Sequence, residues 1–170
     1  MSAPVPPRPW VTVVGSRVEK ALGWALAGLM TLMVVDVTWQ VISRFVFRSP
    51  SSFTEELAGF LLIWIGLLGA AYGIRTRAHL GIDILVDRLG GTMRKGAEIL
   101  AHFLVLLFAL STMVGGGLWL VRLAFRLDQT SAAMGIPMGF VYLALPLSGA
   151  LMVLFSLESV ARTIRKKGGL

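Results

Sequence analysis

Residues 57–74 read LAGFLLIWIGLLGAAYGI and contain no charged side chain. An α-helix rises about 1.5 Å per residue, so roughly 20 residues cross the ~30 Å of hydrocarbon in a bilayer. This stretch is therefore predicted to span a membrane. Three other stretches are equally long and apolar and lack charge or nearly so, with Asp36 as the exception in the first. The four predicted spans cover residues 21–43, 57–74, 99–121 and 137–158.

The composition of the whole chain agrees with a membrane protein. Hydrophobic residues make up 56% of the 170 residues, charged residues 15%, and the mean hydropathy is +0.79. Four spans use most of the chain and leave too little for a water-soluble domain. The sequence therefore predicts an all-α integral membrane protein that forms a single membrane domain over residues 1–170.

The net charge of +7 raises the question of nucleic-acid binding, but the positions of the basic residues suggest another cause. Twelve of the 16 lie in three regions that are predicted to share one side of the membrane. These are Arg8, Arg17 and Lys20; Arg75, Arg77, Arg88, Arg94 and Lys95; and Arg162, Arg165, Lys166 and Lys167. The positive-inside rule places both termini and the second loop in the cytoplasm, so no nucleic-acid partner is needed.

The N-terminal segment does not resemble a signal peptide. Residues 1–10 contain four prolines and one arginine, and the first span, at residues 21–43, is long for a signal sequence. We expect that span to remain uncleaved. The chain has no cysteine, which excludes disulfides and thiol chemistry.

The second loop is predicted to contain an amphipathic helix, at about residues 80–90. Its apolar side chains recur at near-helical spacing opposite Asp83, Asp87 and Arg88, and basic residues flank it. Such a helix would lie in the cytoplasmic interface and contact membrane lipid. Residues 9–20 are predicted to form a second, shorter helix in the N-terminal arm.

Asp36 is the acidic residue that lies well inside a predicted span. Gln40 and Arg44 follow it at four-residue steps, which makes a polar stripe along one helix face. One interpretation is an ion or proton relay, and the other is a polar contact between helices. Transport sites usually gather several polar groups, so the contact between helices is the preferred interpretation.

Glu55 and Glu56 open the second span. Neighbouring side chains on a helix point about 100 degrees apart, so the two carboxylates cannot share one substrate. Ser52 and Glu55 have the spacing of a capping box, which assigns Glu55 to the helix terminus. Glu56 is left over and is expected to face a partner.

The remaining motifs favour packing over chemistry. Gly69 and Gly73 form a small-xxx-small pair that lets helix backbones approach closely. Pro146 lies inside the fourth span and should kink it. The two histidines, His79 and His102, do not supply the three converging ligands that a metal site needs. We predict no enzyme, no catalytic residue, no metal and no cofactor.

These residues, taken together, resemble a known family, the small DctQ-like membrane subunit of tripartite ATP-independent periplasmic (TRAP) transporters. The similarity extends from residue 44 to about residue 157. Its motifs are Ser52-Phe53-Thr54-Glu55-Glu56-Leu57-Ala58, Trp64, Gly69-Ala70-Ala71, Arg75 and His79-Leu80-Gly81-Ile82-Asp83, then Ile136-Pro137, Tyr142-Leu143 and Leu145-Pro146-Leu147. The chain departs from the family in having Phe53 where tryptophan is common and Gly59 where arginine is common.

The resemblance implies a bacterial inner-membrane transporter that imports an organic acid, such as sialic acid or a dicarboxylate, with an ion gradient that is usually sodium. A periplasmic substrate-binding protein and a large membrane subunit would be the partners, and this chain would scaffold the large subunit. The candidate interface residues are Asp36, Gln40, Arg44, Glu55, Glu56, Trp64, Gly69, Gly73, Arg75, His79 and Asp83.

Two alternatives remain open. A self-sufficient four-helix exporter could use Asp36 as its proton-coupling acid, although such carriers are shorter and need no long basic loop. The chain could also be a structural subunit of another membrane complex.

Overall fold

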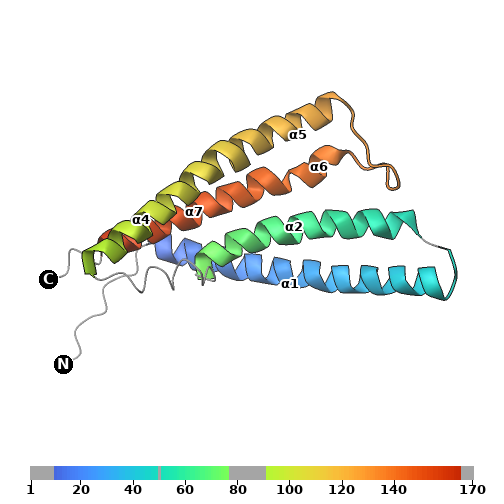
Figure 1. Ribbon diagram of the computed structural model, residues 1–170, viewed down its shortest axis with the longest axis horizontal. Helices are drawn as coiled ribbons and strands as arrows, with labels where there is room; N and C mark the ends of the chain where they lie inside the picture. The colour runs from blue at the N-terminus through green and yellow to red at the C-terminus, as the bar shows by residue number, and fades with distance from the viewer. Residues whose placement is uncertain (1–9, 50, 77–90, 166–170) are drawn as a thin grey trace.

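The computed structural model describes residues 10–49, 51–76 and 91–165, and this part of the chain is built from helices (Figure 1). No β-strand occurs in these residues, and the predicted all-α fold is confirmed. In chain order the helices are α1 (Trp10–Phe45), α2 (Ser52–Thr76), α4 (Gly91–Phe108), the π-helix η1 (Ala109–Gly116), α5 (Gly117–Arg126), α6 (Met138–Tyr142) and α7 (Ala144–Arg165).

Four segments are long and apolar enough to cross a bilayer, as predicted. They are Gly15–Phe45, Ser52–Thr76, Leu100–Arg126 and Met138–Val160. The first belongs to α1, whose 36 residues give a length of about 54 Å. The structure differs here from the predicted separate arm helix, because residues 10–20 continue into the first span as one helix. No proline lies between residues 9 and 50 to interrupt it.

The predicted interfacial helix at residues 80–90 lies outside the described residues, as do His79 and Asp83. Their assignment to the cytoplasmic interface therefore stays a prediction.

The helices form two antiparallel pairs that meet at one end. Figure 1 shows α1 beside α2, and the chain from α4 through α5 beside α6 and α7. The two pairs come together where α1 begins and α7 ends, and they diverge toward the connections at residues 46–51 and 127–137. We call these the termini end and the loop end of the bundle. The buried core lies toward the termini end, with Leu68, Met113 and Phe155 among its members.

The third and fourth spans approach closely through glycines. A Cβ atom at Gly117 would lie 2.9 Å from Cδ of Pro146, and one at Gly149 would lie 2.7 Å from Cβ of Met113. The third span has π-helical geometry over residues 109–116, and this segment includes Met113, which Gly149 approaches. In the fourth span the helix is interrupted between α6 and α7, three residues before Pro146, whose ring and missing N–H disfavour a regular helix there.

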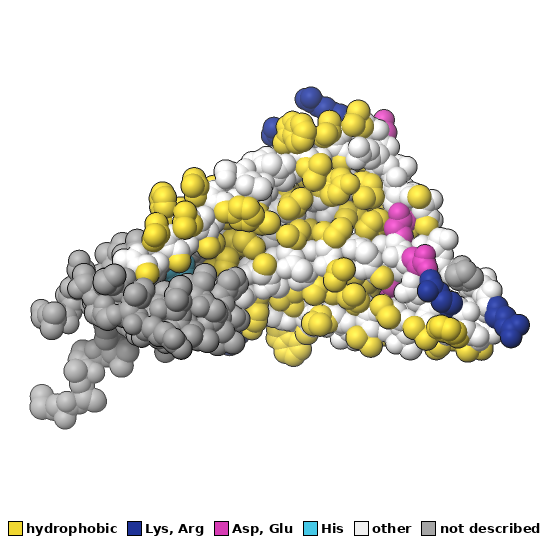
Figure 2. All heavy atoms as spheres, viewed as in Figure 1, with side chains coloured by type: hydrophobic (Ala, Val, Ile, Leu, Met, Phe, Trp, Pro, Cys, Tyr) yellow, Lys and Arg dark blue, Asp and Glu magenta, His cyan; other side chains and the backbone are white. Residues whose placement is uncertain are grey.

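The outer surface is apolar over much of its area. Figure 2 shows hydrophobic side chains spread over the described face, with the basic and acidic ones near its edge. Trp24 and Phe45 of α1 and Trp119 of α5 are mostly exposed. Such a surface is unfavourable in water and is suited to lipid or to the helices of another membrane subunit.

Candidate functional site

The first polar cluster joins three helices at the termini end, and we call it the arginine cluster: Glu19 of α1, Arg75 of α2 and Glu158 of α7. The Nε of Arg75 donates to Oε2 of Glu19 at 2.9 Å, and its Nη1 lies 2.8 Å from Oε2 of Glu158. The side chain of Arg75 is 7% exposed and that of Glu158 is 2% exposed. The guanidinium group also lies 5.8 Å from the centre of the Phe155 ring.

The arginine cluster depends on the mutual pairing of its charges. A charge in a low-dielectric interior is stable only where an opposite charge and hydrogen bonds replace its hydration. The guanidinium group of Arg75 is therefore held by its ion pairs with Glu19 and Glu158. Gly15 of α1 makes room for this arrangement, because a Cβ atom there would collide with the carboxylate of Glu158.

The second polar cluster lies at the loop end, where Glu56 of α2 holds the connection between the third and fourth spans. Its carboxylate accepts a hydrogen bond of 2.5 Å from the Ser131 hydroxyl. It also accepts bonds from three successive backbone N–H groups, those of Ala132 at 3.1 Å, Ala133 at 2.9 Å and Met134 at 3.0 Å. We call Glu56 with residues 131–134 the loop clamp.

The backbone of the clamped loop is folded so that its N–H groups converge. The Gly135 N–H donates to the Ser131 carbonyl at 3.1 Å, and the Met134 N–H is 3.1 Å from the Ser131 hydroxyl oxygen. Gly135 has a φ of 66°, in the left-handed region that glycine adopts at little cost. Converging backbone N–H groups favour an anion, and Glu56 supplies one.

This finding changes the interpretation of Glu56. The sequence suggested that its carboxylate was free to face a partner, whereas in the structure the carboxylate is engaged by the chain's own loop. Whether Glu56 also lies at an interface stays a prediction.

Glu55 lies in the first turn of α2, as predicted for an acid at the helix terminus, and its carboxylate pairs with Arg44. Oε1 of Glu55 lies 2.5 Å from Nη2 of Arg44, an ion pair that joins the end of α1 to the start of α2. Ser52 is already the first residue of α2, so it does not occupy the position before the helix that a capping box requires. Both partners are about half exposed, so the pair contributes little to stability.

Asp36 faces the interior of the described chain and is 6% exposed. Its Oδ2 atom has no hydrogen-bond partner among the described residues, and Arg44 pairs with Glu55 instead. Within those residues no three His, Cys, Asp or Glu side chains gather in one group. Among the described residues Asp36 therefore belongs to no cluster of acids that could hold a metal ion.

The remaining candidates lie on α2. Trp64 is half-buried and lines two apolar grooves, of about 300 and 650 Å³, which it shares with Leu29 of α1. Gly59, Gly66 and Gly69 have no atom within 4 Å of the position that a Cβ would take. These glycines are therefore not used for packing within the described chain.

Glu19, Glu158 and Ser131 were not among the residues predicted from the sequence. Glu158 carried a usable signal, because it is an acid near the end of an apolar span at the same membrane side as Arg75. Ser131 carried no such signal, since short loops with small polar residues are common.

Comparison with known proteins agrees with this architecture. A family model described as "Tripartite ATP-independent periplasmic transporters, DctQ component" matches residues 33–166. The isethionate TRAP transporter permease protein DctMQ of Oleidesulfovibrio alaskensis is 29% identical over 146 residues, which are 82% of this chain and 23% of that protein.

Two small permease proteins are also similar. The C4-dicarboxylate TRAP transporter small permease protein DctQ of Rhodobacter capsulatus is 35% identical over 98 residues, 58% of this chain and 43% of that protein. The sialic acid TRAP transporter small permease protein SiaQ of Vibrio cholerae is 29% identical over 137 residues, 78% of this chain and 75% of that protein. The chain spans less than half the length of the first two of these three relatives.

The matched region begins inside α1 and includes the loop clamp, Arg75 and Glu158, so it covers three of the four spans in full and well over half of the chain. This chain belongs to the family of DctQ components, the small membrane subunits of TRAP transporters.

Proposed function

We propose that this chain is the scaffolding subunit of a secondary transporter, which holds a large membrane subunit in place while a periplasmic binding protein delivers an organic acid. The observation that carries the proposal is that the polar groups of the two clusters bind one another within the chain. The arginine cluster and the loop clamp occupy their charges internally and fasten the helices to one another at both ends. The surface between them is apolar and suited to contact with membrane helices.

The exposed face of α2 is the surface that we assign to the large subunit. It carries Gly59, Leu62, Ile63, Gly66 and Ala70, all exposed. Small residues at a membrane helix surface let a second helix approach closely and gain van der Waals contact. Since the open glycines pack against nothing in the described chain, an external helix is the partner that they fit.

The names of the relatives support the proposed substrate class. They are transporters of isethionate, C4-dicarboxylates and sialic acid, all organic acids. In this chain Arg75 is neutralised by two carboxylates and Arg44 by one, so neither is free to hold an anion. We therefore assign the substrate and the coupling ion, which we expect to be sodium, to the large subunit.

The membrane orientation is also part of the proposal. The distribution of basic residues favours an orientation with the termini end in the cytoplasm of a bacterial inner membrane and the loop end in the periplasm. The loop clamp would then lie on the side from which a periplasmic protein approaches.

Copurification tests the scaffolding role. The tagged chain, expressed with the genes beside its own, should copurify with a large polytopic membrane protein. The Gly66→Leu variant should lose most of that partner, because leucine fills the space that a close helix needs. Gly116→Leu is the matched control, since Gly116 is likewise exposed with open space around it but lies in η1.

Two results would contradict the proposal. The first is a chain that purifies only with copies of itself and transports a substrate alone in proteoliposomes. The second is equal loss of the partner in the Gly66 and Gly116 variants, which would remove the assignment to the α2 face.

A further inference from the structure

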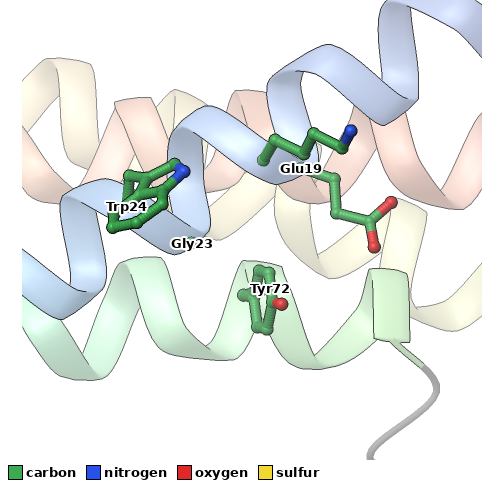
Figure 3. Close-up of a pocket in the computed structure, with 5 residues that line it drawn as sticks. Glu19, Gly23, Trp24 and Tyr72 are labelled. Carbon is green, nitrogen blue, oxygen red and sulfur yellow. The ribbon is translucent and has the colours of Figure 1, made fainter.

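A surface recess of about 320 Å³ lies between α1 and α2 near the termini end, apart from the α2 face assigned to the large subunit. Its lining residues are Glu19, Lys20, Gly23, Trp24 and Tyr72. Figure 3 shows Tyr72 of α2 facing the stretch of α1 that carries Glu19, Gly23 and Trp24. Gly23 adds no side chain to the recess, and a Cβ there would come into ordinary contact with the Tyr72 ring, at 3.6 Å.

From the length of the helices we place the recess near the depth of the lipid headgroups. About 20 residues of helix cross the hydrocarbon, so counting back from Arg44 at the loop end of α1 reaches Trp24. Trp24 is 81% exposed, and an exposed tryptophan at this depth is typical of the membrane interface. The same count along α2 from Glu56 ends at Thr76, one turn beyond Tyr72.

The polar groups of the recess have both signs of charge. Lys20 is exposed and presents an ammonium group. Arg75 occupies Oε2 of Glu19, which leaves Oε1 to accept another hydrogen bond. The hydroxyl of Tyr72 can donate one. The recess thus offers two donors for an anion and one anionic acceptor, next to each other.

We propose that this recess binds the headgroup of phosphatidylethanolamine. The phosphate accepts hydrogen bonds from Lys20 and Tyr72, and the primary ammonium, two carbons away, donates to Glu19. The acyl chains lie along the apolar surface of α1 beside Trp24. Charge complementarity selects this lipid, because the recess pairs a cation with an anion as the headgroup does.

Other common headgroups complement the recess less well. The quaternary ammonium of phosphatidylcholine has no N–H to donate to Glu19. Phosphatidylglycerol has no cation for Glu19 and would place its single charge next to that carboxylate. Because charge-assisted hydrogen bonds are the stronger kind, losing one should reduce affinity about tenfold.

Native mass spectrometry of the purified full-length chain tests the proposal. Detergent-solubilised protein is titrated with phosphatidylethanolamine, phosphatidylcholine or phosphatidylglycerol, all with palmitoyl-oleoyl chains. The expected result is one phosphatidylethanolamine bound about tenfold more tightly than phosphatidylcholine. Lys20→Gln and Tyr72→Phe should each weaken its binding, and Lys20→Arg should retain it.

The matched control is Arg122→Gln, which removes one exposed positive charge at the other end of the bundle and should leave binding unchanged. Equal affinity for phosphatidylethanolamine and phosphatidylcholine would overturn the proposal, as would equal effects of Lys20→Gln and Arg122→Gln. Loss of the bound lipid from the chain when it is copurified with a large subunit would also overturn it, since the recess would then be a protein-docking surface.

Discussion

The Glu56 carboxylate and the Ser131 hydroxyl lie 2.5 Å apart although 75 residues separate them in the chain. One belongs to the first helical pair and the other to the loop that joins the third span to the fourth. Their contact, with the three backbone bonds beside it, connects the two pairs at the end where they diverge.

Replacing Glu56 by alanine should release this loop. The amide hydrogens of residues 132–134 lose the carboxylate that accepts from them, so their exchange with deuterated water should become faster, most clearly at Ala132 and Ala133. Hydrogen-exchange mass spectrometry measures this, and Glu55→Ala is the control because Glu55 pairs with Arg44 and not with the loop. Unchanged exchange in the Glu56 variant would mean that the clamp does not order the loop.

Replacing Arg75 by methionine should destabilise the bundle strongly. The change removes the positive charge that pairs with Glu19 and the buried Glu158, and breaking a buried pair typically costs about 3–5 kcal/mol. A thermal-unfolding assay in detergent measures the loss, with exposed Arg126→Met as the control. Adding Glu19→Gln and Glu158→Gln to Arg75→Met should restore part of the stability, and a failure of that rescue would contradict a charge-pairing role.

Alanine at Gly149 should be destabilising, whereas alanine at Gly66 should be tolerated by the isolated chain. The new Cβ at residue 149 would lie 2.7 Å from Cβ of Met113, and such overpacking costs about 1–3 kcal/mol. At residue 66 the added methyl meets no atom within 4 Å. Thermal unfolding of the two variants in the same detergent distinguishes them, and equal midpoints would show that the spans are less closely packed than the structure indicates.

Asp36→Asn should leave ion coupling unchanged. Among the described residues the carboxylate belongs to no group of three or more His, Cys, Asp or Glu side chains, and a single carboxylate does not complete an ion's coordination shell. Transport in proteoliposomes, measured against the sodium concentration, should show the same apparent number of coupled sodium ions as the parent complex, with any defect confined to assembly. An altered sodium stoichiometry in a normally assembled complex would place Asp36 in the coupling mechanism.

Single cysteines should report the membrane orientation without ambiguity, because the natural chain has none. With the termini inside, an impermeant maleimide applied to spheroplasts should label Thr130→Cys and not Leu170→Cys. Lysed membranes, in which both sites should react, provide the control. Labelling of Leu170→Cys in intact spheroplasts would reverse the topology.

The helical spans could be predicted from sequence because hydrophobic length is a local property. The termini-end position of Arg75 was also visible, as the last residue before a polar loop. Contacts between residues that are distant in the chain could not be predicted in this way. Glu55 matched a local capping pattern, yet Arg44 across the first loop provides a closer and oppositely charged partner.

The glycines also show that contacts between helices could not be predicted from local sequence patterns. Gly69 stands in a small-xxx-small pattern, but a Cβ there would meet no atom within 4 Å, whereas one at Gly149 or Gly117 would collide with the neighbouring span. A pattern of small residues identifies a helix surface that permits close packing. It does not specify which helix will use it, because that depends on how the pairs are arranged.

The loop clamp has a consequence for how this protein can change over evolution. The Glu56 carboxylate accepts hydrogen bonds from the backbone N–H groups of residues 132–134 and from one side chain, that of Ser131. Ala132 and Ala133 can therefore drift to other residue types, provided that the N–H groups are kept and proline is avoided. Insertion or deletion of even one residue would move those N–H groups out of register. We therefore expect relatives to differ in the residue types of this loop but to keep its length.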